Sequence, residues 1–174
     1  MLEPPKRVAT NTSCSRKSMS SRTPSPTPSV AVSISISARP MYPVALEGAL
    51  KLKEISYLHA EGYHAAELKH GPIALLVKDT PVIALACDIA GKDKTLGNIE
   101  ECRARGARIL GVITEGDHEA AETMDDIIEI PACHPLVATI PAAVALQLFA
   151  YHVARARGCE IDQPRNLAKS VTVE

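Results

Sequence analysis

Two apolar runs of strand length restrict the fold of this chain more than any other feature. They are "PVIALAC" at residues 81–87 and "ARILGVIT" at 107–114, and turn-forming or polar residues bound both of them. A strand that is apolar at almost every position is buried on both faces, as in parallel sheets covered by helices. Such sheets commonly bind ligands at the carboxyl ends of their strands.

Helical patterns alternate with these runs. Apolar residues recur with helical spacing at residues 43–57, 94–106 and 136–157, and a short helix beginning near Glu61 or Ala65 should stop at Gly71-Pro72. Residues 127–131 resemble another short strand, and residues 117–126 a short acidic helix or loop. Short connections between alternating strands and helices predict a three-layer αβα sandwich with a mainly parallel sheet.

The composition argues against a nucleic-acid partner. Aromatic residues make up only 3% of the chain, with no Trp, which disfavours the stacking platforms of single-strand binders. Residues 1–40 carry six basic residues and one acidic residue, a net charge of +5. Because the total is −1, the remaining residues carry −6. A mildly acidic body lacks the positive surface that phosphate backbones require.

The cysteine content and the hydropathy indicate where in the cell the protein is expected. The five cysteines are odd in number and widely spaced, without a CxxC or zinc spacing, so we expect reduced thiols and a cytoplasmic protein. No apolar run reaches the roughly 18–20 residues of a membrane span, so no membrane partner is expected.

The chain divides into three predicted parts. Residues 1–40 form an atypical Ser/Pro/Arg-rich segment that we expect to be disordered, with a possible strand at 29–37 where "SVAVSISIS" alternates with period two. The Ser- and Arg-rich composition also loosely resembles an organelle transit peptide. Residues 41–160 form the α/β domain, and residues 161–174 form a tail.

Three places could carry chemistry. Lys51 and Glu54 share a helix face, either as a surface ion pair or as functional groups. His70 beside Gly71-Pro72 could be a capping residue or a general acid/base. Lys169 lies in a tail that alternates apolar and polar residues to its end, as a packed segment does. A lysine held among apolar groups can attack a carbonyl as the free amine, whereas an exposed lysine does not.

The remaining motifs give no metal or nucleotide site. His59 and His64 flank Glu61 at a spacing that does not bring all three to one helical face, so we expect no metal there. His134 beside Cys133 is weak support for a metal or a catalytic pair. The chain has neither GxGxxG nor GxxxxGK[ST].

Two long motifs carry a resemblance to a known family. "YPVALEGALKLKEISYLHAEGYHAAELKHGP" and the terminal "DQPRNLAKSVTVE" closely resemble the C-terminal part of the glutamine–fructose-6-phosphate aminotransferases, over residues 41–174. The resemblance implies a sugar isomerase (SIS) domain followed by a catalytic tail. It also implies conversion of fructose 6-phosphate to glucosamine 6-phosphate, without metal or redox cofactor, in a homodimer.

The resemblance also implies roles for five residues. Glu54 is similar to the base that moves a proton between C1 and C2 of the sugar, and Lys51 to a lysine that orients the substrate. His70 is similar to the ring-opening histidine, which the family contributes across a dimer interface. Lys169 is similar to the lysine that forms a Schiff base with the ketose, and Ala168 lines the same pocket.

The chain departs from the family at its N-terminal side. The glutaminase domain and the first SIS domain, which in the family cradles the sugar phosphate, are missing, so we expect a fragment without glutamine hydrolysis or phosphate recognition. The Ser at alternate positions of "SISIS" departs from the apolar strand expected there, and a shifted reading frame or a truncated gene would explain residues 1–40. The alternatives are a non-catalytic sugar-phosphate-binding module and a dimerisation module that pairs through residues 136–153.

Overall fold

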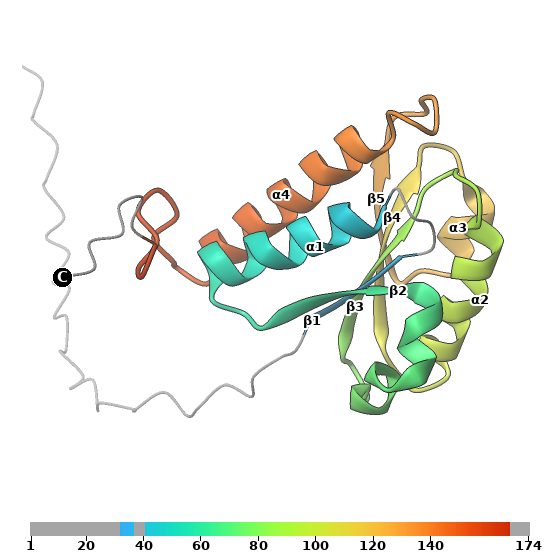
Figure 1. Cartoon of the computed structure of the whole chain (residues 1–174), viewed down its shortest axis with the longest axis horizontal. Helices are drawn as coiled ribbons and strands as arrows, with labels where there is room; N and C mark the ends of the chain where they lie inside the picture. The colour runs from blue at the N-terminus through green and yellow to red at the C-terminus, as the bar shows by residue number, and fades with distance from the viewer. Residues whose placement is uncertain (1–31, 37–40, 168–174) are drawn as a thin grey trace, which may run out of the picture.

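A five-stranded parallel sheet forms the middle layer of the protein (Figure 1). The computed structural model describes residues 32–36 and 41–167. The strands lie in the order β2-β1-β3-β4-β5, and every neighbouring pair is parallel. They are β1 (Val32–Ile36), β2 (Ala60–His64), β3 (Pro81–Ala86), β4 (Arg108–Thr114) and β5 (Asp126–Ile130).

Helices cover both faces of the sheet, which confirms the predicted three-layer αβα sandwich. One face packs against α1 (Tyr42–Lys51) and α4 (Thr139–Ala156), which lie side by side in Figure 1. The other face packs against α2 (Lys92–Arg103), α3 (His118–Glu122) and two 3₁₀ helices, η2 (Ala65–His70) and η3 (Pro72–Leu75).

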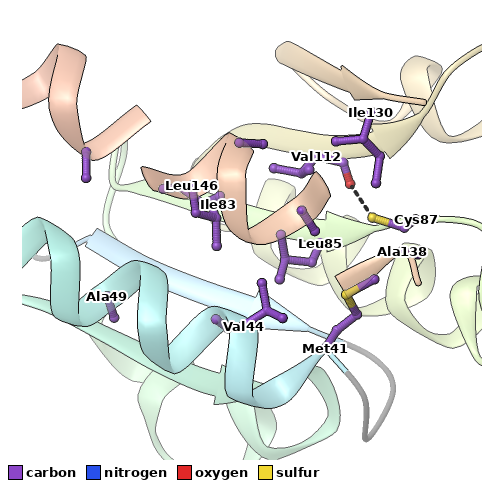
Figure 2. Packing of buried hydrophobic residues seen from close by; sticks show 14 of the residues in the cluster. Met41, Val44, Ala49, Ile83, Leu85, Cys87, Val112, Ile130, Ala138 and Leu146 are labelled. Atoms are coloured by element: carbon purple, nitrogen blue, oxygen red, sulfur yellow. Dashed lines mark hydrogen bonds between the residues drawn. The ribbon is translucent and has the colours of Figure 1, made fainter. Parts of the chain in front are cut away.

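Strand β3 explains the uninterrupted apolar run in the sequence. Ile83 and Leu85 pack into the cluster under α1 and α4, which Figure 2 shows together with Val112 of β4. Val82 and Ala84 pack into the cluster on the opposite face. All four β3 residues are at most 1% exposed, so both faces of the strand require apolar side chains.

The described cysteines are all free, as the sequence predicts. Cys87 and Cys102 are buried, Cys133 is exposed and Cys159 is half-buried. The Cys87 thiol donates to the carbonyl of Val112 at 3.6 Å (Figure 2), and burial raises its pKa to about 12. Cys87 is therefore an inert core residue.

The edge of the sheet differs from the sequence prediction. Of the two predicted starts of the short helix, Glu61 is wrong, because Ala60–His64 form β2. The other start is confirmed, since the 3₁₀ helix η2 begins at Ala65. The alternating segment "VSISI" forms β1 between β2 and β3. Parallel pairing uses backbone groups, so serine at alternate positions does not prevent it. Most of the predicted N-terminal segment, residues 1–31 and 37–40, lies outside the described residues, and the domain boundaries stay predictions.

The two long helical predictions are close to the observed helices. The predicted helix 43–57 is α1 followed by a π-helical turn, η1 (Leu52–Ser56), and the predicted helix 136–157 is α4. Tyr57 ends η1 in the left-handed conformation, with φ 58°. Within the described residues, no helix has both the length and the hydropathy needed to cross a membrane.

Two glycines let α1 approach its neighbours closely. A Cβ atom at Gly62 of β2 would lie 3.0 Å from the backbone nitrogen of Leu46 in α1. A Cβ atom at Gly48 of α1 would lie 2.5 Å from Cδ1 and 3.1 Å from Cβ of Leu146 in α4. The absence of side chains at these positions fixes α1 against both β2 and α4.

The contact between Gly48 and Leu146 can be tested by overpacking. Gly48→Val should reduce the free energy of unfolding by about 1–3 kcal/mol, because the added methyl groups collide with a buried side chain. Gly97→Val in α2 is the matched control, since no heavy atom lies within 4 Å of an added Cβ there. We expect the control to change stability by less than about 0.5 kcal/mol. Equal losses in urea unfolding of the two variants would contradict this account.

Candidate active site

Lys51 and Glu54 meet where α1 passes into η1. Lys51 Nζ lies 2.7 Å from Oε2 of Glu54 and 3.5 Å from Oε1 of Glu47. The hydrogen bond that Lys51 donates to Glu54 is the main cause that raises the pKa of Lys51, although burial acts in the opposite direction. The side chains of Lys51 and Glu54 are 32% and 26% exposed, so a ligand can reach this pair.

The chain returns to this point after α4. The Arg157 side chain donates from Nε to the carbonyl oxygen of Ser56 at 3.1 Å, and the Cys159 thiol donates to the same oxygen at 3.8 Å. Ser56 is itself buried and donates its hydroxyl to the carbonyl of Leu52 at 2.6 Å. The end of η1 and the start of the tail are therefore joined through one carbonyl group.

Tyr57 makes a second contact with the tail. The backbone N–H of Arg165 donates to the Tyr57 hydroxyl at 2.9 Å, and the Arg165 guanidinium carbon lies 4.3 Å from the centre of the Tyr57 ring. The same side chain thus offers a hydrogen-bond acceptor and a cation–π surface to one residue. Tyr57, Arg157 and Arg165 were not singled out from the sequence, because each makes its contact across about a hundred residues.

These contacts create a cavity beside Glu54. The cavity has a volume of about 270 Å³ and opens to solvent. Its lining comes from both segments: Lys53, Glu54, Tyr57, Arg165, Asn166 and Leu167. Ala168 and Lys169, two of the predicted site residues, lie outside the described residues and directly follow this lining. A carboxylate that can hold a proton is therefore next to the chain that leads to the predicted nucleophile.

His70 lies away from this cavity. In a strand–helix–strand connection the helix runs antiparallel to the strands, so η1 lies at the amino edge of the sheet. Strand β2 then returns the chain, over roughly 13 Å, to the carboxyl edge where η2 carries the exposed His70. Figure 1 shows η1 and η2 at opposite ends of β2. Within a single chain, Lys51 and Glu54 lie together, whereas His70 lies at the opposite edge of the sheet.

The carboxyl edge carries a different cavity. It has a volume of about 280 Å³ and is lined by Asp88, Lys92, Thr114, Glu115, Gly116, Asp117 and Ala132. Three carboxylates surround the one cation, and Lys92 is already paired with Asp117 at 2.8 Å. An acidic lining disfavours a sugar phosphate. Parallel sheets commonly bind ligands at the carboxyl edge, but the Glu54 cavity lies at the amino edge.

No metal centre is found in the part of the chain that the structure describes. There, no group of three or more His, Cys, Asp or Glu side chains is arranged around a common point. His59 lies 3.5 Å from Glu61, and the ring of His64 lies against that of Tyr42 with their centres 5.8 Å apart. These histidines have local packing and pairing roles.

The tail contact predicts faster amide exchange in Tyr57→Phe. The variant keeps the ring but removes the acceptor of the Arg165 N–H, a loss of about 0.5–1.5 kcal/mol. Hydrogen–deuterium exchange in residues 160–167 should then be roughly 2- to 10-fold faster. Tyr151→Phe, on the exposed side of α4, is the control and should leave that exchange unchanged. Unaltered tail exchange in Tyr57→Phe would show that this hydroxyl does not hold the tail.

The pairing of Lys92 with Asp117 predicts a loss of stability in acid. Burial alone would raise the pKa of Asp117, but the Lys92 ammonium and the Ala120 N–H together lower the pKa below its usual value. A carboxylate with a lowered folded pKa stabilises the protein above its unfolded pKa, about 3.9, and loses that contribution as the pH falls through the folded pKa.

One variant should lose the part of the acid dependence that Asp117 contributes. Asp117→Asn should lower the free energy of unfolding by about 1–3 kcal/mol at pH 7 and flatten its decline between about pH 4 and 2. Glu119→Gln removes the 76%-exposed carboxylate 3.9 Å from Lys92 and should leave the profile unchanged. Parallel profiles for wild type and Asp117→Asn would contradict the assignment.

Comparison with known proteins identifies the family. Residues 34–156 match the SIS domain. Glutamine–fructose-6-phosphate aminotransferases [isomerizing] of Gloeobacter violaceus and Thermus thermophilus are each 56% identical to this chain, over 133 and 132 residues. These matches cover 76% of this chain but only 22% of each relative, so the chain spans about a fifth of their length.

Solved structures agree with the sequence matches. The C-terminal domain of glucosamine-fructose-6-phosphate aminotransferase from Francisella tularensis superimposes with a TM-score of 0.68 and 40% identity, covering 76% of this chain and 37% of that chain. A glucosamine-6-phosphate deaminase from Thermotoga maritima gives a TM-score of 0.58 and 29% identity, covering 82% of this chain and 40% of that chain. With a match that spans well over half of its residues, the chain belongs to the SIS domain family.

Proposed function

We propose that this chain carries the isomerising part of glucosamine 6-phosphate synthesis and acts on fructose 6-phosphate. The observation that carries the proposal is the shared cavity, in which Glu54 and the residues leading to Lys169 line one space. The relatives named as isomerizing aminotransferases support the choice of substrate. The chain shares only a fifth of their length, so glutamine hydrolysis is not part of this proposal.

Each proposed role follows from the chemistry of an aldose–ketose isomerisation. The Lys169 amine attacks the C2 carbonyl of the open-chain ketose and water leaves, which gives an imine. Ammonia, supplied from outside this chain, replaces the lysine amine at C2 and frees Lys169. Glu54 then moves a proton from C1 to C2 of the resulting imine, which gives the 2-amino aldose. Lys51 holds the Glu54 carboxylate at 2.7 Å and orients the substrate, and Ala168 lines the pocket. These steps use amine and carboxylate groups and call for no metal or redox cofactor.

The separation of His70 from Glu54 supports a homodimer. His70 would open the sugar ring from a second subunit, since its own chain carries it at the opposite edge of the sheet. We place this dimer in the cytoplasm, where the free thiols of the described residues remain reduced.

A second candidate is a non-catalytic module that binds a sugar phosphate. The observation that favours it is the pairing of Lys51 with Glu54, which leaves the carboxylate already neutralised in the absence of a ligand. Arg165 also supplies positive charge to the cavity, and positive charge could hold a phosphate. Such a module would bind the sugar but would not form the imine.

Imine trapping separates the two candidates. Incubation with fructose 6-phosphate and sodium borohydride reduces the C=N bond to a stable secondary amine. We expect the intact mass of the wild-type chain to rise by one reduced sugar phosphate and Lys169→Ala to show no adduct. A wild-type chain that binds fructose 6-phosphate without an adduct would favour the non-catalytic module.

Lys53→Ala provides the matched control for that experiment. Lys53 lines the same cavity and is exposed, but it has no proposed part in the covalent step. It should keep the adduct at no less than about half of the wild-type level, since loss of one exposed charge costs little. An adduct that survives in Lys169→Ala but disappears in Lys53→Ala would reassign the nucleophile.

A further inference from the structure

Glu54 lies in the π-helical turn η1 and not in the regular helix α1 that precedes it. Such turns are rare in proteins and frequently occur at functional sites. Tyr57 closes η1 with a φ of 58°, a left-handed conformation that is unfavourable for a residue with a side chain. Unfavourable local conformations persist where the surrounding structure holds them. The position of Glu54 therefore depends on contacts from outside η1.

Ser56, the last residue of η1, is buried and both of its oxygen atoms form hydrogen bonds. Its hydroxyl donates to the carbonyl of Leu52 at 2.6 Å, the group that an α-helix would pair with the N–H of Ser56. Its carbonyl lies at the end of the turn, where a helix leaves its last carbonyls without an internal partner. Because Ser56 is 0% exposed, this carbonyl needs a donor from elsewhere in the chain.

The end of α4 supplies two donors to the Ser56 carbonyl. Arg157 donates from Nε at 3.1 Å, and the thiol of Cys159 donates at 3.8 Å. A guanidinium is a charged donor and a thiol is a weak one, so Arg157 makes the stronger bond. Gly158 lies between them with a φ of 68° and donates its N–H to the carbonyl of Arg155, so the helix ends there and the chain turns toward Ser56.

We propose that Arg157 is a positioning residue for Glu54. Its bond to the Ser56 carbonyl holds η1 in the π-helical turn, and Glu54, two residues earlier in that turn, is thereby held beside Lys51 and the cavity. Arg157 does not line the cavity that the described residues form, so it acts through the backbone and not on the sugar. The catalytic consequence rests on the proposed function, whereas the hold on η1 does not.

Hydrogen–deuterium exchange of the full chain without sugar tests the hold on η1. Arg157→Met keeps an unbranched side chain but removes the donor, so the amides of residues 52–57 should exchange at least about tenfold faster. Exchange in β3 should not change. Arg157→Lys keeps a charged donor and should restore part of the protection. Arg155→Met is the matched control, because this exposed residue of the same last turn points about 200° away from Arg157.

A second readout separates positioning from a general loss of structure. With fructose 6-phosphate and ammonium chloride in deuterium oxide, Glu54 takes a proton from C1, exchanges it with solvent and returns deuterium to the sugar. Arg157→Met should lower the rate of this incorporation by at least about tenfold, because the carboxylate is misplaced. The borohydride adduct of Lys169 should stay at about half of the wild-type level or more, since the imine forms without Glu54. A general loss of structure would lower both together.

The two readouts fail independently of each other. Unchanged exchange of η1 in Arg157→Met, equal acceleration in Arg155→Met, or no recovery in Arg157→Lys would overturn the proposal. So would a parallel fall of deuterium incorporation and adduct in Arg157→Met. A wild-type chain that gives neither deuterium incorporation nor an adduct would contradict the proposed function, and the amide exchange of η1 would still decide whether Arg157 holds the turn.

Discussion

The position of α1 depends on a close approach of backbone to backbone. At Gly62 no side chain separates β2 from the backbone of Ala45 and Leu46, and at Gly48 none separates α1 from Leu146. Helix α1 is therefore held between the sheet and α4 with little freedom to shift or rotate. Since η1 continues α1 directly, the same contacts fix where Glu54 and Tyr57 lie.

The parallel topology then decides which groups can meet. A helix between two parallel strands ends at the amino edge, which places Glu54 there and leaves His70 at the other edge. The tail begins after α4, whose last turn also lies beside η1, so Arg157 and Cys159 reach the carbonyl of Ser56. The candidate site is thus built from segments about a hundred residues apart in the sequence, while His70, one of its predicted members, lies at the opposite edge of the sheet.

Residue patterns within single segments predicted most of the strands and helices. The continuous apolar runs became β3 and β4 because both faces of those strands are buried, and helical spacing gave α1, α2 and α4. Strand β2 was missed because "AEGYH" contains alanine, glutamate and glycine, which have low strand propensity, and its pairing with β1 makes it a strand.

Some contacts of the candidate site could be predicted from the sequence, and others could not. The pairing of Lys51 and Glu54 follows from their spacing on one helix and is observed. The contacts of Tyr57 with Arg165, and of Ser56 with Arg157, could not be predicted, because no periodicity links residues so far apart. The resemblance to a family supplied Lys169 and Ala168, which lie outside the described residues, so their roles stay predictions.

The proposed function requires Lys169 to reach the cavity beside Glu54, and a zero-length cross-link tests this central claim most directly. A carbodiimide joins a carboxylate to an amine only where the two are in contact, and the Lys51–Glu54 pair at 2.7 Å provides an internal positive control. We predict that peptide mapping will find Glu54 joined to Lys169 as well as to Lys51. A product that joins Glu54 to Lys51 but never to Lys169 would contradict the account.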